Sequence, residues 1–388
     1  MYKIFNHKNI NNLTKKTPFY LYDRELLLDT LLEAKTAAKT YLKHQFCIHY
    51  ALKANDNKEI LKLIHEHKFG IDCVSGGEVK KALLANFEKN KIVFAGVGKT
   101  DPEIRFALQN NIYAFNTESI EEIAVINKIA KKLDLVAKIM IRINPDVDAK
   151  THKHISTGKY DNKFGITFDD ASTFLKNLSD FKNIKFIGLH YHIGSQITDM
   201  KVFKELAFKI NSHYKHLQIL NINITDLDIG GGLGVNYTNP IAEPIANFNN
   251  YFKIIAENLD IPLHIKLHFE LGRAIVAQCG VLISTVIFTK NTAGTNFAII
   301  DAGMNDLMRP ALYNANHKIV KINARKNDVM NKFHIVGPVC ESTDIFAKNV
   351  KIANLRRSDK IILYSAGAYG KVLANQYNSR KLIKEYLI

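Results

Sequence analysis

The chain has 388 residues, enough for two domains, and its 47% hydrophobic and 23% charged residues are typical of an ordinary globular protein. No apolar run approaches the roughly 18 residues of a membrane span, and the N-terminus has no apolar stretch suited to a secretory signal, so we expect no membrane association. The net charge of +16, from 53 Lys and Arg against 37 Asp and Glu, is spread along the whole chain, which argues against a nucleic-acid-binding surface.

Cysteine and histidine spacing argues against disulfide and metal chemistry. The four cysteines are too few and too scattered for a disulfide framework or a zinc site, and they fit a reducing cytoplasm. His190 and His192 alternate on one strand face, but no third ligand with suitable spacing follows them. We therefore expect a cytoplasmic protein without a bound metal.

Strand-like and amphipathic helical runs alternate from about residue 24 to residue 275. The eight strand candidates are 46–53, 69–74, 92–96, 112–115, 137–144, 184–192, 224–230 and 264–270. Helical stretches such as 57–67, 78–86, 119–132 and 200–214 lie between them. Eight β/α units over some 250 residues predict a TIM-type (β/α)₈ barrel, because the alternative, a doubly wound open sheet, usually has fewer strands.

After Cys279 the pattern changes to short strand-like runs joined by turns, at 281–289, 296–300, 319–324, 333–336 and 360–364. These runs predict an all-β second domain. The isolated strand-like segment 18–22 precedes any helix and could pair with it. We thus predict a barrel over residues 24–275 and a β-rich domain formed by residues 1–23 and 276–388.

Lys53 ends the first apolar strand, in the segment Tyr50-Ala51-Leu52-Lys53-Ala54-Asn55. A lysine at the edge of a core has a lowered pKa, which predisposes its amine to form a Schiff base with a carbonyl group. On this segment alone, the alternative that Lys53 merely extends into solvent stays open. The rest of the chain favours the chemical role.

Unusual residues also follow the sixth, seventh and eighth strands, where barrels place their working residues. Strand six leads into His192 and Ile193-Gly194-Ser195-Gln196, strand seven into the glycine run 230–234, and strand eight into Glu270-Leu271-Gly272-Arg273. Glycines let backbone N–H groups approach an anion, so this run predicts a phosphate site. A phosphate site together with a strand-end lysine suggests pyridoxal phosphate as the cofactor.

Two further residues suit that cofactor. His192 can lie flat against the pyridine ring, and Glu270 can keep the pyridine nitrogen protonated, which makes the ring a stronger electron sink. In the second domain, Cys340 follows a Gly-Pro turn beside acidic residues. A buried, merely packing cysteine is the alternative, but this setting favours a proton-donating role.

Together these motifs resemble those of the diaminopimelate decarboxylases, which belong to the barrel-type pyridoxal-phosphate decarboxylases with the ornithine and arginine enzymes. The resemblance covers nearly the whole chain and rests on 50–55, 192–196, 230–234, Cys340-Glu341-Ser342 and Gly367-Ala368-Tyr369. It implies the alanine racemase-like fold, which is type III among pyridoxal-phosphate enzymes. The implied reaction converts meso-2,6-diaminopimelate to L-lysine and CO₂, the last step of lysine biosynthesis, through an external aldimine and a quinonoid.

The resemblance also implies roles for individual residues. Lys53 carries the cofactor, His192 stacks on its ring, Glu270 contacts the pyridine nitrogen, and Asp72 is an acid near the lysine. The phosphate region is assigned to Ser195, Gly232, Gly272, Arg273 and Tyr369. The distal carboxylate of the substrate is assigned to Arg273, Arg309 and Tyr313, and its distal ammonium group to Glu341, with Tyr369 also at the substrate.

Cys340 resembles the family's general acid, which the partner subunit supplies, so a homodimer with shared active sites is implied. Residues 154–158 resemble the family's active-site loop. One departure is Leu271, which stands where the family has proline. Because proline stiffens a turn, we expect weaker cofactor retention here without loss of activity.

Three alternatives stay open. The first is decarboxylation of carboxynorspermidine or a basic amino acid, and the Arg309 and Tyr313 pair argues against basic amino acids because these lack a distal carboxylate. The second is an amino-acid racemase, which typically pairs the pyridine nitrogen with arginine instead of a glutamate. The third is a non-catalytic relative that binds pyridoxal phosphate, but such proteins tend to lack either the lysine or the cysteine.

Overall fold

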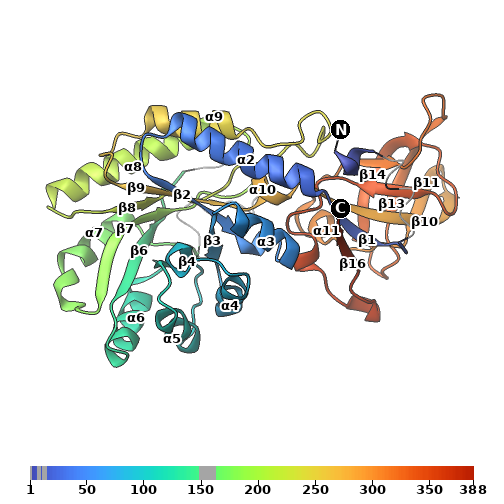
Figure 1. Ribbon diagram of the computed structural model, residues 1–388. Coiled ribbons are helices and arrows are strands. Elements are labelled where there is room, and N and C mark those ends of the chain that lie inside the picture. Colours follow the sequence, from blue (N-terminus) through green and yellow to red (C-terminus); the bar gives the residue numbers. More distant parts are fainter. Residues whose placement is uncertain (1, 7–9, 11–14, 148–162) are drawn as a thin grey trace. The chain divides into compact units, whose positions relative to one another are not determined.

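The computed structural model describes residues 2–6, 10, 15–147 and 163–388 (Figure 1). The chain divides into two compact units. The first, here called the barrel unit, comprises Leu31–Gly234 and Asn247–Gly272; the second, the β unit, comprises Met1–Thr30, Val235–Ala246 and Arg273–Ile388. No helix in the described ranges is long and apolar enough to cross a membrane. The predicted boundaries at residues 24 and 275 stay a prediction.

The barrel unit contains eight parallel strands that close in chain order, which confirms the predicted fold class (Figure 1). Most strand residues are buried, as expected of parallel strands covered by helices on the outside. The strands are β2 (Phe46–Ala51), β3 (Gly70–Cys73), β4 (Ile92–Phe94), β5 (Ala114–Thr117), β6 (Ala137–Ile143), β7 (Ile184–Tyr191), β8 (Asp226–Asp228) and β9 (Lys266–Leu271).

Helices precede or follow the barrel strands, and several of them begin at polar residues whose side chains accept hydrogen bonds from the first free backbone N–H groups. Asn57, Ser75, Ser119 and Thr167 act in this way, and Thr100 forms a capping box with Glu103. The helices are α2 (Arg24–Tyr41), α3 (Lys58–Glu66), α4 (Gly76–Leu84), α5 (Asp101–Gln109), α6 (Ile120–Lys132), α7 (Phe168–Lys176), α8 (Lys201–Ile219) and α9 (Phe248–Asn258).

The barrel interior contains a buried chain of polar side chains below the ends of the strands. His49 on β2 bonds to the backbone oxygen of Lys91 (3.2 Å) and to His268 on β9 (2.8 Å). His268 bonds in turn to Asp226 on β8 (2.8 Å), which also accepts a hydrogen bond from Tyr113. Barrel interiors are usually filled by branched apolar side chains, so this interior layer is unusual.

The β unit is built on a mainly antiparallel sheet with the strand order β12-β15-β10-β11-β13-β14, in which β11 and β13 are parallel. β1 pairs with β10 and also with β16, which confirms that the N-terminal strand joins this domain. The strands are β1 (Phe19–Tyr22), β10 (Gly280–Thr292), β11 (Thr295–Ile300), β12 (Ile319–Lys321), β13 (Met330–Val336), β14 (Ile345–Ala353), β15 (Lys360–Leu363) and β16 (Lys384–Leu387). Two short helices, α10 (Arg273–Val276) and α11 (Arg309–Tyr313), belong to the same unit.

Two strands of the β unit were not predicted. In β14 the apolar alternation is interrupted at Lys348 and Asn349, and Asn349 has a positive φ of 54°. β16 is four residues long, half of them charged, and among the described strands it pairs only with β1, so its sequence carries little strand signal.

Candidate active site

Lys53 lies just beyond the first barrel strand. The prediction that it ends the strand was wrong in detail, because β2 ends at Ala51 and Lys53 occupies a short 3₁₀ turn, Leu52–Ala54. The turn brings the Lys53 Nζ atom within 3.4 Å of Asp72 Oδ2 on β3. Asp72 is fully buried while the lysine side chain is 35% exposed, so the amine is reachable from outside the core.

The second oxygen of Asp72, Oδ1, is buried and has no hydrogen-bond partner among the described residues. Burial, reinforced by the negative charge of Glu270 and opposed by Lys53, raises the pKa of Asp72 to about 6. An unpaired buried acceptor beside an amine leaves room for a further donor from a bound molecule.

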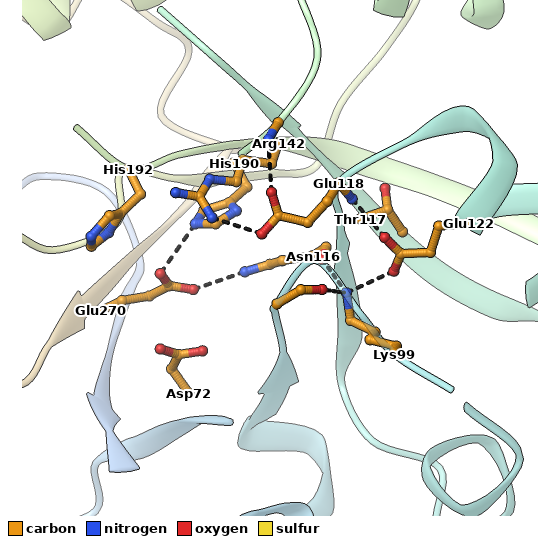
Figure 2. A network of polar contacts seen from close by, with 12 residues as sticks. Asp72, Lys99, Asn116, Thr117, Glu118, Glu122, Arg142, His190, His192 and Glu270 are labelled. Atoms are coloured by element: carbon orange, nitrogen blue, oxygen red, sulfur yellow. Dashed lines mark hydrogen bonds and ion pairs between the residues drawn. The ribbon is translucent and has the colours of Figure 1, made fainter. Parts of the chain in front are cut away.

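Glu270, on β9, belongs to the polar network in Figure 2, where dashed lines join it to His190 and Asn116. Its two carboxylate oxygens accept hydrogen bonds from Asn116 (2.8 Å) and from His190 (3.1 Å). Burial alone would favour the neutral acid, but the charge and hydrogen bond of His190 outweigh it and hold the pKa of Glu270 well below its usual range. Glu270 is therefore a buried ionised carboxylate.

Asp228, on β8, is a third buried carboxyl group near Glu270. It accepts a hydrogen bond from the Gly230 N–H (2.8 Å) and a longer one from Asn116 (3.3 Å). Burial, with the negative charge of Glu270, raises the pKa of Asp228 well above its usual range. Only one of two such close carboxyl groups ionises easily, and here Glu270 is the ionised one.

The backbone of Asn116 is held in place by the buried Lys99. Lys99 Nζ donates to the backbone oxygens of Asn116 (2.8 Å) and Gly96 (2.9 Å) and pairs with Glu122 (2.6 Å), as Figure 2 shows. This fixes the end of β5, from which the Asn116 side chain reaches Glu270.

His192 follows β7, and its Nδ1 atom accepts a hydrogen bond from the Gly231 N–H (3.3 Å). Burial of the ring, together with the positive charges of Arg142 and Lys53, lowers the pKa of His192 well below its usual range. The ring is therefore neutral, with its proton on Nε2, and it can stack on a flat aromatic group.

The glycine turn after β8 is required by close backbone packing. A side chain at Gly230 would collide with the Tyr191 carbonyl oxygen, and one at Gly231 with that of Glu270. The turn pairs with the segment after Ser195, because the Ile197 N–H donates to the Gly232 oxygen (2.9 Å). The structure thus brings together the Ser195 and Gly232 segments that were predicted to hold phosphate.

Gly272 is also fixed by packing against the Lys53 turn. A Cβ atom at Gly272 would lie 3.1 Å from the Cβ atoms of Ala51 and Ala54. Leu271, the residue that departs from the family pattern, is buried and ends β9 opposite Tyr50. Its expected effect on cofactor retention stays a prediction.

In the β unit, two predicted arginines, Arg273 and Arg309, are buried close to aromatic rings. Arg273 donates to the Tyr237 hydroxyl (2.7 Å) and lies 4.9 Å from the Tyr369 ring centre. Arg309 lies 4.6 Å from the Tyr237 ring centre, and within the described ranges no carboxylate pairs with it. Its buried Nε atom has no hydrogen-bond partner among the described residues.

Tyr313 is half-buried at the end of α11, the helix that begins with Arg309. Cys340 and Glu341 are exposed on the turn between β13 and β14. Their turn is held by the Asp344 carboxylate, which accepts hydrogen bonds from the Val339 and Met304 N–H groups (both 2.7 Å). The predicted loop at 154–158 lies outside the described residues.

Sequence reasoning missed Asn116 and Asp228, although each is a polar residue at or near the end of a barrel strand, the same signal that identified Lys53. The ligand atoms of His190, Asp228 and Glu270 lie within 4.8 Å of one another. The His190 and Glu270 atoms already bond to each other. The absence of a metal stays a prediction.

Residues 28–277 match the family model described as the pyridoxal-binding domain of pyridoxal-dependent decarboxylases. A diaminopimelate decarboxylase from Bacteroides thetaiotaomicron is 46% identical to this chain over 96% of both proteins. The crystal structure of Helicobacter pylori diaminopimelate decarboxylase complexed with L-lysine has a TM-score of 0.90 and 40% identity, covering 98% of this chain and 94% of that one.

This chain belongs to the pyridoxal-dependent decarboxylases. A second solved relative, the M. jannaschii diaminopimelate decarboxylase in complex with L-lysine, has a TM-score of 0.86 and 36% identity over 96% of this chain and 87% of that one. The family membership confirms pyridoxal phosphate as the cofactor.

The residues of the barrel unit fit pyridoxal phosphate. Lys53 offers an amine, the neutral His192 a flat face, Glu270 an ionised carboxylate, and the half-buried Gly232 a backbone without a side chain that would keep an anion away. The unpaired Asp72 oxygen offers an additional acceptor.

Proposed function

We propose that this protein decarboxylates meso-2,6-diaminopimelate to L-lysine and CO₂, the last step of lysine biosynthesis. The relatives that match over nearly the whole chain are named diaminopimelate decarboxylases, and two solved ones contain L-lysine. The observation that carries the proposal is Arg309, a buried cation that no described carboxylate pairs with. A buried guanidinium requires an anion, and the distal carboxylate of diaminopimelate is one.

Bound pyridoxal phosphate supplies an aromatic ring that accepts the electron pair left behind when CO₂ departs. Lys53 holds the cofactor through its amine, and Asp72 stabilises that amine before binding. Glu270, ionised and fixed by Asn116 and His190, keeps a proton on the pyridine nitrogen. The neutral His192 ring supports the flat face of the cofactor without adding a charge.

The remaining predicted residues act on the substrate and on the cofactor phosphate. Arg309, Arg273 and Tyr313 hold the distal carboxylate, Glu341 holds the distal ammonium group, and Cys340 delivers the proton that replaces CO₂ on the α carbon. The cofactor phosphate and its surroundings are assigned to Ser195, Gly232, Gly272, Arg273 and Tyr369.

Release of CO₂ from a panel of substrates tests this function. We expect turnover of meso-diaminopimelate and little from lysine, ornithine or carboxynorspermidine. Lysine and ornithine carry no distal carboxylate, so they would leave Arg309 unpaired. Turnover of ornithine or carboxynorspermidine in preference to meso-diaminopimelate would overturn the substrate assignment. Binding of pyridoxal phosphate without any CO₂ release would favour a non-catalytic role.

We also propose a homodimer in which each active site uses Cys340 of the partner subunit. In support, Cys340 and Glu341 are exposed on a turn in the single chain. Mixing two inactive variants, Lys53→Ala and Cys340→Ala, tests this arrangement. If sites are shared, random exchange gives mixed dimers with one intact site, so about a quarter of the wild-type activity should return. If Cys340 acts within its own chain, the mixture stays inactive.

A cytoplasmic location is part of the same proposal. It is supported by the four free cysteines, which suit a reducing compartment. Fractionation of cells that produce the protein checks it.

A further inference from the structure

Arg309 and Arg273 present a problem that their proposed role leaves open: what holds two buried cations in place when no substrate is bound. Both side chains are about 5% exposed. Burial lowers the pKa of Arg309, and the neighbouring charge of Arg273 acts in the same direction. A guanidinium nevertheless remains charged in proteins, so both groups must be fixed as cations.

The first group that fixes Arg309 is His317, in the connection between α11 and β12. His317 Nε2 lies 3.0 Å from Arg309 Nη1, and His317 Nδ1 lies 2.8 Å from the Tyr364 carbonyl oxygen. A carbonyl oxygen only accepts and a guanidinium only donates, so Nδ1 carries the proton and Nε2 is the acceptor. Burial, reinforced by the charge of Arg309, lowers the pKa of His317 to about 3, so the ring is neutral at physiological pH.

The second group is Tyr237, in the segment that follows the glycine turn. Its ring face lies 4.6 Å from the Arg309 guanidinium carbon, and its hydroxyl accepts the Arg273 hydrogen bond at 2.7 Å. The Tyr237 and His317 rings meet edge to face, with centres 5.4 Å apart. One tyrosine thus contacts both arginines, and the histidine packs against that tyrosine.

Both partners orient the guanidinium groups without neutralising them. A carboxylate at position 317 would bind Arg309 at least as strongly, but it would cancel the charge that a ligand needs. A neutral acceptor and an aromatic face instead leave the full positive charge available. Neutral partners around a buried guanidinium group are expected where an anion from a ligand binds it.

We infer that His317 and Tyr237 are positioning residues that hold Arg309 and Arg273 ready for the distal carboxylate of the substrate and so set the preference for substrates that carry one. This inference rests on the proposed function. Neither residue is assigned a contact with the substrate. Their effect is exerted through the arginines.

A matched pair of substitutions tests the role of His317. In His317→Gln, the amide can accept from Arg309 and donate to the Tyr364 oxygen, so the KM for meso-diaminopimelate should change little. In His317→Glu, a carboxylate faces Arg309, and the KM should rise about 10- to 100-fold with kcat much less affected, the range for loss of a charge-assisted hydrogen bond. His334→Gln, a half-buried histidine on β13, is the control and should behave as wild type.

Inhibitor binding separates positioning from a general structural role. Pimelate is a dicarboxylate of the same chain length as the substrate, and it should bind about 10- to 100-fold more weakly to His317→Glu than to His317→Gln. L-lysine lacks the distal carboxylate and should lose far less affinity. Equal losses for pimelate and L-lysine, or equal behaviour of the Gln and Glu variants, would overturn the inference.

If His317→Glu does not fold, Tyr237→Phe decides the question, because it keeps the ring on Arg309 and removes only the hydroxyl, which accepts the hydrogen bond from Arg273. It should weaken pimelate binding several-fold without changing the absorbance of the bound cofactor, and unchanged binding would refute the inference. Pimelate binding, measured by calorimetry, does not depend on turnover. A wild-type protein that binds pimelate through these residues but releases no CO₂ from meso-diaminopimelate would refute the proposed function alone.

Discussion

The molecule contains two buried clusters of like charge, and they are stabilised in opposite ways. In the barrel unit, Asp72, Asp228 and Glu270 are three carboxyl groups with little access to water. In the β unit, Arg273 and Arg309 are two guanidinium groups in an equally dry setting. Asp228 and Glu270 share hydrogen bonds with Asn116, whereas the arginines share the ring and hydroxyl of Tyr237.

The difference follows from what each group can do with its proton. A crowded acid can stay neutral, and the pKa of Asp228, raised well above its usual range by burial and by the charge of Glu270, shows that the barrel cluster reduces its charge in this way. Arginine cannot respond by losing its proton. The acid cluster can therefore lower its own charge, while Arg309, which pairs with no carboxylate among the described residues, requires a negative charge from a ligand. Four substitutions test this difference between the acids and the arginines.

The largest effect is expected from Lys53→Ala, which removes the cation beside the acid cluster. The variant should retain no covalently attached pyridoxal phosphate after borohydride reduction and should show no turnover, because no other described amine is assigned to the cofactor. Mass spectrometry of the reduced protein checks this. Lys58→Ala, an exposed lysine on α3, is the control. A reducible adduct in Lys53→Ala would show that another amine carries the cofactor.

Glu270→Gln should come next, because it removes the member of the acid cluster whose pKa His190 holds well below its usual range. The cofactor should remain bound, as its absorbance would show. We expect kcat to fall by about two to three orders of magnitude, the loss seen when a fixed electrostatic partner of the reacting group is removed. An unchanged kcat would mean that the ionised state of Glu270 has no electronic role.

Arg309→Ala removes half of the cationic cluster and should act on substrate preference. Truncating one partner of a buried charge pair costs roughly 2–5 kcal/mol, so kcat/KM for meso-diaminopimelate should fall by about two to three orders of magnitude. Inhibition by L-lysine, which has no distal carboxylate, should change far less. Arg325→Ala, at an exposed arginine, is the control. Parallel losses for both molecules would make Arg309 structural.

The smallest effect is expected from Asp228→Asn, because this acid already holds its proton in the folded protein. Turnover should change little. A raised pKa means that the folded state keeps a proton which the unfolded chain releases above its ordinary value of 3.8, so this group lowers stability as the pH rises. Asparagine removes that dependence. The melting temperature should therefore fall less steeply from about pH 4 to 8 in the variant than in the wild type. An equal slope in both proteins would mean that Asp228 does not cause this pH dependence.

The sequence was informative where polar residues interrupt an apolar pattern. Lys53 and Glu270 stand out at or just beyond the ends of barrel strands, and the barrel itself follows from eight regular repeats. Asn116 and Asp228 carry the same signal, but their role depends on sharing hydrogen bonds with Glu270, which lies on another strand. Only the closed barrel makes that contact visible.

The support for the arginines could not be predicted in the same way. Tyr237 and His317 lie in connecting segments without periodicity, and each meets Arg309 through tertiary packing. Likewise, β14 was missed because its alternation breaks at Lys348 and Asn349, and its pairing with β13 compensates for the weak local pattern.

The interior chain of His49, His268 and Asp226 has a consequence for how this barrel can evolve. Each member completes the hydrogen bonding of the next, so replacing one by an apolar residue would strand a buried polar atom on its neighbour. Replacing the set together would leave nothing stranded. We therefore expect these three positions, on strands β2, β8 and β9, to change together in evolution. The two histidines and the aspartate should be either all retained or all replaced.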